Sequence, residues 1–360
     1  MQQLVFKYRI KDKHAKRLAA QARAVNIVWN YCNETQQKAA KAHRKWLTGY
    51  DLVGLTAGAV DAGLDLHSHT IQRVCLEYAK SRRQQRKPWL RWRGRKSLGW
   101  VPFNTGHIVF RDGALVFRGK TYRVWLDRPI PEGAAIGAGS FNQDSCGHWY
   151  LNVPVEVETA NLASIDKVGI DLGLSSLVAL SNGETIQAPQ FYRKSEAVLA
   201  TAQRARKTKR VRRIHTKARN RRKDFLHKES ARLTKRYGLI VIGDVSASKI
   251  ARSRFAKSVL DAGWADLKQM LSYKAIRHGG STLEVSERYT SQSCSECGSL
   301  PASRPKGIAG LRNRVFACDD CGAVLDRDVN AARNILGCGL ATLVGGTLPS
   351  SGNPGLQAGE

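Results

Sequence analysis

Four cysteines stand in two closely spaced pairs in the C-terminal third of the sequence. Each pair has two residues between its cysteines and a glycine directly after the second, and twenty residues separate the pairs: Cys294, Cys297, Cys318 and Cys321. This spacing predicts a tetrahedral four-thiolate zinc site, in which each glycine lets the backbone turn around the metal. Two disulfides in a secreted protein are the alternative, which the lack of a signal-peptide pattern disfavours. We expect one structural zinc ion in a small module over residues 292–325.

Two acidic residues occupy positions where a strand is expected to face the core. Asp171 interrupts an apolar strand, and a carboxylate there is costly unless it is paired or coordinates a cation. An aspartate held by a nearby turn or arginine is the structural alternative. Glu287 continues the alternation of Leu283 and Val285, so its side chain should point where theirs do. Glu284 falls on the opposite face and is expected to be solvated.

A further acidic pair, Asp326 and Asp328, begins a predicted helix over residues 326–336. An aspartate at this place can simply cap the helix and favour the positive end of its dipole. We expect Asp326 to cap or support the helix and Asp328 to lean into a site. If Asp171, Glu287 and Asp328 converge, their oxygen atoms can hold two Mg²⁺ ions about 4 Å apart. Such ions support phosphodiester cleavage, because one activates water while the other stabilises the leaving oxygen.

The elements that must position these acids follow the order of a ribonuclease-H-like nuclease. The sequence predicts a hairpin with an Asn-Gly turn, a long basic helix, a buried strand, a second helix, a strand and a final helix, at residues 168–183, 196–237, 239–245, 251–278, 283–287 and 326–336. The zinc module would interrupt this domain before its last helix. The tail, residues 344–360, is rich in Gly, Ser and Pro and is expected to be disordered.

The N-terminal half combines strand and helix patterns. Strands are predicted at residues 2–10, 108–110, 114–117, 122–126 and 149–157, and helices at residues 11–33 and 68–85. Residues 49–63 are too rich in Gly and Ala to assign. These elements predict a small β-barrel that is interrupted by a helical insertion.

The charge points to a polyanionic partner. Lys and Arg total 59 against 29 Asp and Glu, a formal net charge of +30, and no segment approaches the roughly 18 apolar residues of a membrane span. Residues 204–223 hold twelve cations and no acid: Arg204, Arg206, Lys207, Lys209, Arg210, Arg212, Arg213, Lys217, Arg219, Arg221, Arg222 and Lys223. A solvated helix face normally mixes signs, so we expect this run to bind a nucleic-acid backbone. An incidentally basic enzyme is the alternative.

A second basic segment, Arg82–Trp100, carries tryptophans among its cations. Trp89, Trp92 and Trp100 could stack on unpaired bases, or they could belong to the core of the barrel. The sequence leaves both interpretations open.

Four motifs together resemble the TnpB family, transposon-encoded RNA-guided DNA nucleases related to type V CRISPR effectors and to Fanzor. They are Gly169-Ile-Asp-Leu-Gly, the buried strand ending in Asp244, Tyr289-Thr-Ser-Gln-Ser-Cys-Ser-Glu-Cys-Gly298 and Asp326-Arg-Asp-Val-Asn-Ala-Ala-Arg-Asn-Ile335. The resemblance is dense over about residues 165–340 and holds only in plan before them.

The resemblance implies an α/β plus β fold: a ribonuclease-H-like (RuvC) nuclease domain with an inserted zinc module, preceded by a β-barrel (WED) that carries a helical (REC) insertion. The implied divisions are residues 1–10 and 96–160 (WED), 11–95 (REC), 161–291 and 326–343 (RuvC), and 292–325 (zinc module). It further implies an Mg²⁺-dependent RNA-guided DNA endonuclease that cuts beside a short target-adjacent motif. Guide RNA and double-stranded target DNA would be its partners, with no membrane. The protein would act in the prokaryotic cytoplasm, at the nucleoid, as a monomer or a homodimer on the RNA.

One position departs from the family pattern. The family usually carries its second catalytic acid as Glu-Asp-Leu at the end of the buried strand, whereas this sequence has Gly243-Asp244-Val245. Either the chain is a nuclease-dead RNA-guided repressor, or another acid replaces the missing glutamate. A lineage with a relocated glutamate, as in Fanzor, implies Glu287 in that role, and Asp244 is the less favoured substitute. A DNA-only resolvase of the same fold is a third hypothesis.

Overall fold

The computed structural model describes residues 2–43, 46–106, 108–111, 114–126, 129–130, 134–157, 164–174, 176–245, 256–305 and 313–345. The chain divides into two compact units, residues 1–158 and 159–360, called here the N-terminal and C-terminal units. Among the helices that the structure describes, none is both long and apolar enough to cross a membrane.

The N-terminal unit is built on a seven-stranded antiparallel sheet. Its strands are β1 (Gln2–Ile10), β2 (Trp100–Phe103), β3 (Ile108–Arg111), β4 (Ala114–Phe117), β5 (Lys120–Trp125), β6 (Gly139–Gln143) and β7 (Trp149–Val157), in the order β2-β6-β7-β1-β5-β4-β3. In β7, fully buried residues alternate with residues that are mostly half-buried, which shows that one face of the sheet is covered. The short strands β2 and β6 were not predicted from the sequence.

An aromatic core draws the two ends of this sheet together. Phe103 lies on the edge strand β2, yet its ring centroid is 5.9 Å from that of Phe117 on β4 and 5.5 Å from that of Phe141 on β6. Because β2 and β4 stand near opposite ends of the strand order, the sheet must curl around these rings. A curled sheet with a filled interior agrees with the predicted barrel.

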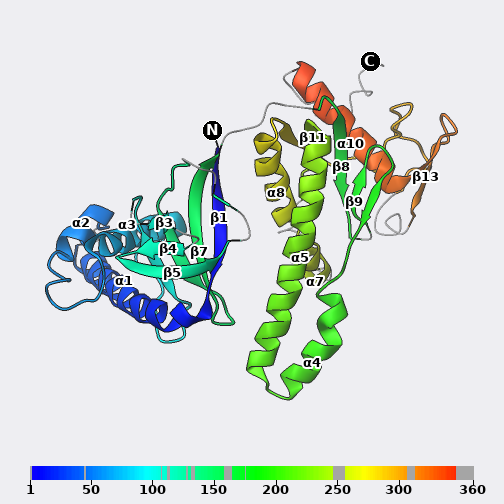
Figure 1. Cartoon of the computed structure of the whole chain (residues 1–360). Coiled ribbons are helices and arrows are strands. Elements are labelled where there is room, and N and C mark those ends of the chain that lie inside the picture. The colour runs from blue at the N-terminus through cyan, green and yellow to red at the C-terminus, as the bar shows by residue number, and fades with distance from the viewer. Residues whose placement is uncertain are drawn as a thin grey trace. The chain divides into compact units, whose positions relative to one another are not determined.

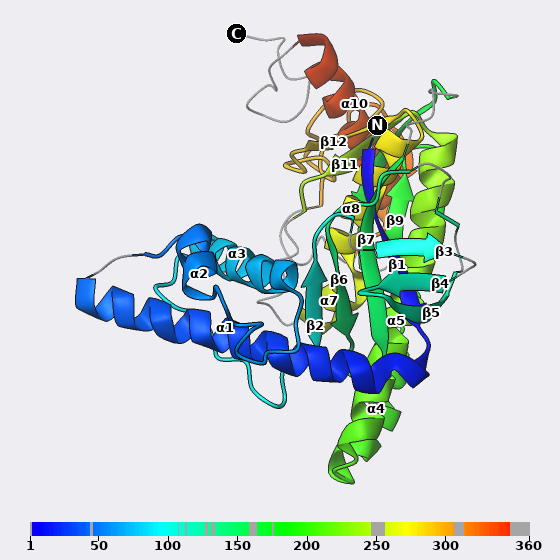
Figure 2. The same cartoon turned by 60° about the vertical axis from the view of Figure 1, so that its left-hand side comes forward.

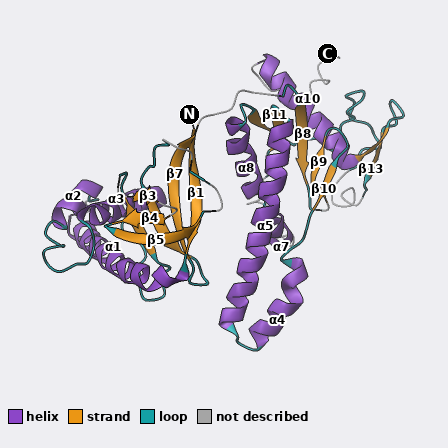
Figure 3. Ribbon diagram, viewed as in Figure 1, coloured by secondary structure: helices purple, strands orange, loops and turns teal. Residues whose placement is uncertain are grey.

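A helical insertion separates β1 from β2. It comprises η1 (Asp12–His14), α1 (Ala15–His43), α2 (Gly49–Leu55) and α3 (Ser68–Gln85), which lie together beside the strands (Figures 2 and 3). Helix α1 extends ten residues beyond its predicted end, and α2 falls in the segment that the sequence left unassigned. A reciprocal capping box between Thr48 and Asp51 begins α2. The buried hydroxyl of Tyr78 on α3 donates to Asn33 of α1 at 2.8 Å and fastens these two helices.

The C-terminal unit contains a five-stranded mixed sheet. Its strands are β8 (Lys167–Leu172), β9 (Ser176–Leu180), β10 (Thr185–Gln187), β11 (Leu239–Gly243) and β12 (Ser281–Val285), in the order β10-β9-β8-β11-β12. Strands β8, β11 and β12 are parallel, whereas β9 and β10 form antiparallel pairs. Numbered within the sheet, this order is 3-2-1-4-5, with the antiparallel strands on one side of β8 and the parallel strands on the other.

Helices cover both faces of this sheet (Figure 1). The helices are η2 (Arg193–Ser195), α4 (Glu196–Arg204), α5 (Thr208–Arg236), α7 (Ala256–Ala262), α8 (Trp264–Arg277) and α10 (Arg327–Gly345). Ile240 and Ile242 pack towards α5, α7 and α8, whereas the intervening Val241 packs against Ile335 of α10. Successive side chains of β11 point to opposite faces of the sheet, so this strand packs against a helical layer on each face.

Helix α10 lies unusually close to β8 because Gly169 leaves room for it. A β-carbon at position 169 would come 2.1 Å from the Ala332 carbonyl oxygen. Gly169 and Asp171 are two residues apart on β8 and therefore share the face that α10 covers. The close approach of α10 brings its first turn, with Asp328, to the same side of the sheet as Asp171.

Several predicted elements differ from the observed ones. The single basic helix over 196–237 is two helices, α4 and α5, because Arg206 adopts a left-handed conformation (φ 50°) between them. The helix predicted over 251–278 is also two helices, divided at Gly263 (φ 72°), and its residues 251–255 lie outside the described residues. The first two residues of the tail predicted to be disordered belong to α10, and residues 346–360 lie outside the described residues.

Candidate functional site

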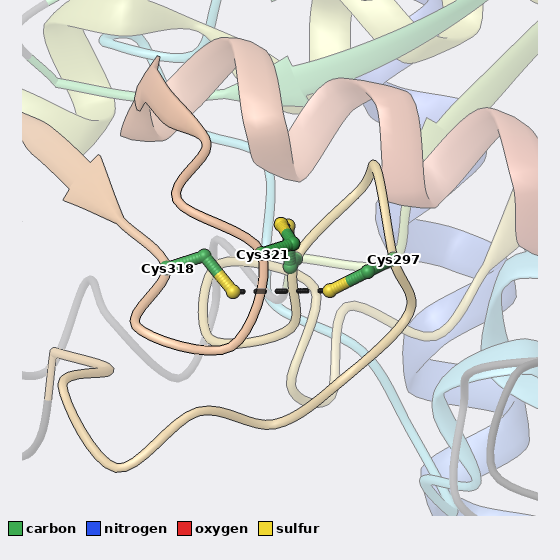
Figure 4. Close-up of side chains that lie close together, drawn as sticks. Cys297, Cys318 and Cys321 are labelled. Carbon is green, nitrogen blue, oxygen red and sulfur yellow. Dashed lines mark hydrogen bonds between the residues drawn. The ribbon is translucent and has the colours of Figure 1, made fainter.

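The four predicted zinc ligands converge. The sulfur atoms of Cys294, Cys297, Cys318 and Cys321 all lie within 4.8 Å of one another. Two of the sulfur–sulfur distances are 3.7 Å (Cys294–Cys321) and 3.8 Å (Cys297–Cys318), and Figure 4 shows the latter two sulfur atoms facing each other. A tetrahedron with zinc–sulfur bonds of about 2.3 Å has edges of about 3.8 Å, so the donor set fits a zinc ion.

Two matching turns hold these cysteines. In each, the glycine after the second cysteine donates its N–H to the carbonyl of the first at 2.9 Å, from Gly298 to Cys294 and from Gly322 to Cys318. Both glycines have positive φ, 75° and 74°, which strains other residues. The second turn connects the short antiparallel strands β13 (Val315–Ala317) and β14 (Val324–Asp326). The expected zinc module is therefore two turns and a hairpin inserted between β12 and α10.

Asp171 lies near the centre of the sheet on the face covered by α10. Burial, followed by the charges of Glu287 and Asp328, raises the pKa of Asp171 to about 7, while the charge of Arg327 acts in the opposite direction. The charges of both Glu287 and Asp328 therefore act on Asp171. An acid that is poised in this way is typical of functional sites.

Glu287 occupies the space that a side chain at position 243 would need. A β-carbon on Gly243 would come 2.1 Å from Glu287 Oε1, 2.4 Å from its Cγ and 2.6 Å from its Cδ. The Glu287 backbone N–H donates to Asp244 Oδ1 at 3.1 Å, and the Asp244 N–H donates to the Val285 carbonyl at 2.8 Å. These bonds fix the turn after β12 against the end of β11. The end of the Glu287 side chain thus fills the space directly beside the α-carbon of Gly243.

The Glu287 carboxyl group is compensated only in part, by the charge of Lys268 and a hydrogen bond from the Val245 backbone. Burial raises its pKa to about 7 against the opposing charge of Lys268, and the charge of Asp244 adds to the increase. Its Oε1 is buried and has no hydrogen-bond partner among the described residues. Glu284 is instead exposed and pairs with Lys268, as the strand alternation predicted. A buried carboxylate oxygen without a partner is costly unless a cation or proton reaches it.

Asp326 and Asp328 have different partners. Asp326 Oδ1 accepts the backbone N–H groups of Asp328 at 2.9 Å and Val329 at 3.0 Å, so Asp326 caps α10 as expected. Asp328, whose side chain is 13% exposed, pairs through Oδ1 with Arg327 at 3.1 Å and through Oδ2 with Arg314 at 3.0 Å. Both oxygen atoms of this acid are therefore held by guanidinium groups.

These two arginines were not identified in the sequence. Arg327 has a visible signal, because it stands between the two acids of the Asp-Arg-Asp motif. Arg314 has no such signal in the sequence, because it belongs to the zinc module. The Arg327 N–H donates to the Arg314 carbonyl, and this bond holds Arg314 beside the start of α10.

Within the described residues, only the four cysteines bring three or more ligand atoms within reach of a single ion. The acids interact electrostatically but do not by themselves form such a group.

The predicted basic run forms an exposed surface on α4 and α5. Of its twelve cations, eleven are exposed, and Arg222 is partly buried and approaches Asp261 at 3.8 Å. For the other eleven, the described part of the chain provides no ion pair. Arg222 therefore has a structural contact, whereas the remaining cations are available to a polyanion.

The C-terminal unit is a mixed α/β domain whose central strand carries Asp171. In the sequence, a four-cysteine module is inserted between the last strand of its sheet and the last helix, α10. Residues 151–254 match the family described as "Probable transposase" (OrfB_IS605), and residues 264–335 match the "Cas12f1-like, TNB domain". A "Putative RNA-guided DNA endonuclease" of Streptomyces pristinaespiralis is 35% identical over 275 residues, which cover 71% of this chain and 67% of that protein. The chain therefore belongs to the TnpB/IS605 family, and the resemblance is confirmed.

Two further relatives extend the comparison. The "Putative RNA-guided DNA endonuclease InsQ" of Escherichia coli (strain K12) is 33% identical over 240 residues, which cover 58% of each chain. A solved Cas12f1–sgRNA–target DNA complex aligns with 93% of this chain and 99% of that one, at 15% identity and a TM-score of 0.39. The relocated-glutamate subgroup within the family stays a prediction.

Proposed function

We propose that the protein is an RNA-guided DNA endonuclease that hydrolyses double-stranded DNA matched to a bound guide RNA, next to a short target-adjacent motif. Family membership and the names of two relatives support this activity. The observation that carries it for this chain is the position of Glu287, whose carboxylate fills the space beside Gly243. The protein would act on the nucleoid in a prokaryotic cytoplasm.

We assign Asp171, Glu287 and Asp328 as the acids that would hold two Mg²⁺ ions. Asp171 and Glu287 fit this role, because both are carboxyl groups whose pKa burial raises, and one oxygen of Glu287 has no hydrogen-bond partner among the described residues. When bound, the two ions would activate a water molecule and stabilise the leaving oxygen. Asp328 could bind a metal ion only after releasing Arg314 or Arg327, because these arginines hold both of its oxygen atoms.

The surrounding residues have supporting roles in this proposal. Asp326 caps α10 and thereby fixes the backbone from which Asp328 projects. Asp244 holds the Glu287 N–H and fixes the turn that delivers the carboxylate. Asp171 extends from the central strand β8, whose backbone is bonded on both sides. Metal loading requires the loss of any protons that Asp171 and Glu287 carry.

The exposed cations of α4 and α5 would bind the backbone of the guide RNA or of its duplex with DNA. The curled sheet with its helical insertion would correspond to the WED and REC parts, and the C-terminal unit to the RuvC domain with its zinc module. Guide RNA and double-stranded DNA are the partners that this arrangement would serve.

The test is cleavage of a plasmid by the purified protein carrying its guide RNA, with Mg²⁺ present. We expect a plasmid that matches the guide to be cut and a plasmid with a scrambled target to survive. Asp171→Asn should bind the matched plasmid without cutting it. Equal cutting of matched and scrambled plasmids, or cutting without RNA, would instead indicate a DNA-only resolvase.

A guided repressor is the second candidate, because Gly243 offers no acid where the family has one. Tight, guide-dependent binding of the matched plasmid with no cleavage in Mg²⁺ or Mn²⁺ would establish it. The presence of all three acids of the proposed site argues for cleavage.

A further inference from the structure

The loop that joins α3 to β2, residues 86–99, is held rigidly against α1. Asn33 accepts the Leu90 N–H at 2.8 Å in a buried contact, and the Trp29 indole donates to the Arg91 carbonyl at 3.2 Å. Asn30 both donates to the Arg93 carbonyl and accepts its N–H, each at 2.8 Å. The backbone on either side of Trp92 is therefore fixed.

At Trp92 and Arg93 the usual placement of apolar and charged side chains is reversed. The Arg93 guanidinium points inward: it lies 5.7 Å from the Trp29 ring centroid and 5.8 Å from that of Trp100, and it donates to Asn26 at 2.7 Å and to the Leu98 carbonyl at 2.7 Å. The neighbouring Trp92 points outward and is 48% exposed. No ring contact or indole hydrogen bond covers Trp92 within the described residues.

The sequence on either side of Trp92 is rich in cations. The sequence contains no acid between Glu77 and Asp112. Of the nine cations between Lys80 and Lys96, Arg82 and Arg93 turn inward, and Arg82 is 3% exposed with a hydrogen bond to the Leu47 carbonyl. The other seven are exposed, with no ion pair among the described residues: Lys80, Arg83, Arg86, Lys87, Arg91, Arg95 and Lys96.

We propose that Trp92 is a stacking platform for an unpaired base of bound nucleic acid, with Arg91, Arg95 and Lys96 on the adjoining phosphates. A flat exposed indole among uncompensated cations matches a ligand with a flat base and a phosphodiester backbone. A base inside a duplex is already stacked on its neighbours, so the platform selects an unpaired nucleotide. Of the three tryptophans that the sequence left open, the structure separates Trp92 from Trp100, because the ring of Trp100 packs on Trp29.

The proposal rests on the proposed function only in taking nucleic acid as the partner. The site is in the N-terminal unit and involves none of the three acids. Binding without cleavage can therefore test it alone, and a failure here would leave the nuclease proposal standing.

The experiment uses the full-length chain freed of nucleic acid, in buffer without Mg²⁺. The probes are an eight-nucleotide single strand containing 2-aminopurine, made as RNA and as DNA, and a blunt duplex of the same DNA sequence. Fluorescence anisotropy gives the affinity, and quenching of 2-aminopurine reports stacking. Trp125→Ala is the control, because Trp125 is 58% exposed on β5 of the same unit but already has Lys11 Nζ over its ring, 4.9 Å from the centroid.

We expect Trp92→Ala to weaken single-strand binding by about 5- to 150-fold, the range equivalent to one stacked base, and to lose part of the quenching. Trp92→Tyr should retain most of both, and Trp125→Ala should match the wild type. Arg95→Ala should reduce the slope of log affinity against log salt, whereas Trp92→Ala should leave it unchanged. If Trp92→Ala loses affinity only for the single-stranded RNA, the site is specific for RNA. If it loses affinity for the RNA and the DNA single strands alike, the site binds unpaired nucleotides in general.

Two results would overturn the proposal. The first is wild-type single-strand affinity and quenching in Trp92→Ala. The second is an equal loss of affinity for the duplex, which would make Trp92 part of a backbone contact. Thermal unfolding of both Trp92 variants shows whether the chain is folded, and Trp92→Tyr serves as the decisive variant if Trp92→Ala is not.

Discussion

The carboxylate of Glu287 lies directly over the α-carbon of Gly243, where a β-carbon would come 2.1 Å from Oε1. The two residues are 44 positions apart in the sequence and meet because β11 and β12 are parallel neighbours, with Gly243 opposite Val285. Glycine at 243 is therefore a requirement for the observed position of Glu287. We therefore predict that Glu287 replaces the acid that the family usually carries at the end of β11.

Replacing Gly243 by alanine should displace the Glu287 carboxylate. We expect plasmid cleavage to fall by about 100-fold, since a displacement of about 1 Å in an active site can cost this much. Gly337→Ala is the matched control, because a β-carbon there meets nothing within 4 Å and alanine favours the helix. Wild-type cleavage by Gly243→Ala would show that the position of Glu287 does not matter.

The acid should also be transferable between the two strands. Glu287→Gly should abolish cleavage, and adding Gly243→Glu should restore a measurable part of it, because removing the Glu287 side chain frees the space that a side chain at position 243 needs. Initial rates on the matched plasmid measure this. If the double variant is as inactive as Glu287→Gly, the two positions are not equivalent.

Removing Arg314 should make Asp328 more available to a cation. Arg314 pairs with Asp328 Oδ2 at 3.0 Å, and a partly exposed pair of this kind is worth about 1 kcal/mol or less. Arg314→Ala should therefore bind Mn²⁺ up to about fivefold more tightly than the wild type, measured by calorimetry without DNA. Arg333→Ala, which loses a pair with Glu296, is the control and should bind Mn²⁺ as the wild type does. Weaker Mn²⁺ binding by Arg314→Ala would show that Arg314 does not compete with metal.

The raised pKa values of Asp171 and Glu287 predict a pH dependence of stability. Both rise to about 7 from ordinary values of 3.8 and 4.5, so between about pH 4 and 7 the folded chain binds more protons than the unfolded chain. The free energy of unfolding of the Mg²⁺-free, zinc-loaded protein should therefore fall as pH rises through this window. Asp171→Asn should weaken this dependence and unfold at a higher temperature than the wild type at pH 8. An unchanged dependence in this variant would contradict the burial of a charged Asp171.

If the four cysteines bind zinc, replacing one of them should release the metal. Cys318→Ser should reduce the zinc content of the purified protein from about one ion per chain to near zero, because a structural site needs its four thiolates. Cys146→Ser is the control. Cys146 lies outside the zinc module, so this variant should keep its zinc. Unchanged zinc in Cys318→Ser would exclude the four-cysteine site.

Local patterns in the sequence predicted much of this architecture. The cysteine spacing located the module, and strand alternation predicted that Glu284 is exposed. The strand predicted over 283–287 ends at Val285, however, so Glu287 lies in the turn that follows and its position is set by that turn and not by strand alternation. The break at Arg206 was missed because no Gly or Pro marks it, and it depends on one left-handed backbone conformation. Arg314 was missed because its contact with Asp328 arises from the pairing of β13 and β14, which no short pattern encodes.

The central claim is tested most directly by comparing Glu287→Gln with Glu284→Gln in guide-programmed plasmid cleavage. Both variants remove one negative charge near the end of β12, but only Glu287 occupies the space beside Gly243. We predict that Glu284→Gln cleaves at the wild-type rate and that Glu287→Gln cleaves more than about 100-fold more slowly. A loss of this size exceeds the usual effect of replacing a residue that only hydrogen-bonds a metal ligand. Cleavage by Glu287→Gln at the wild-type rate would contradict the assignment of Glu287 to the site.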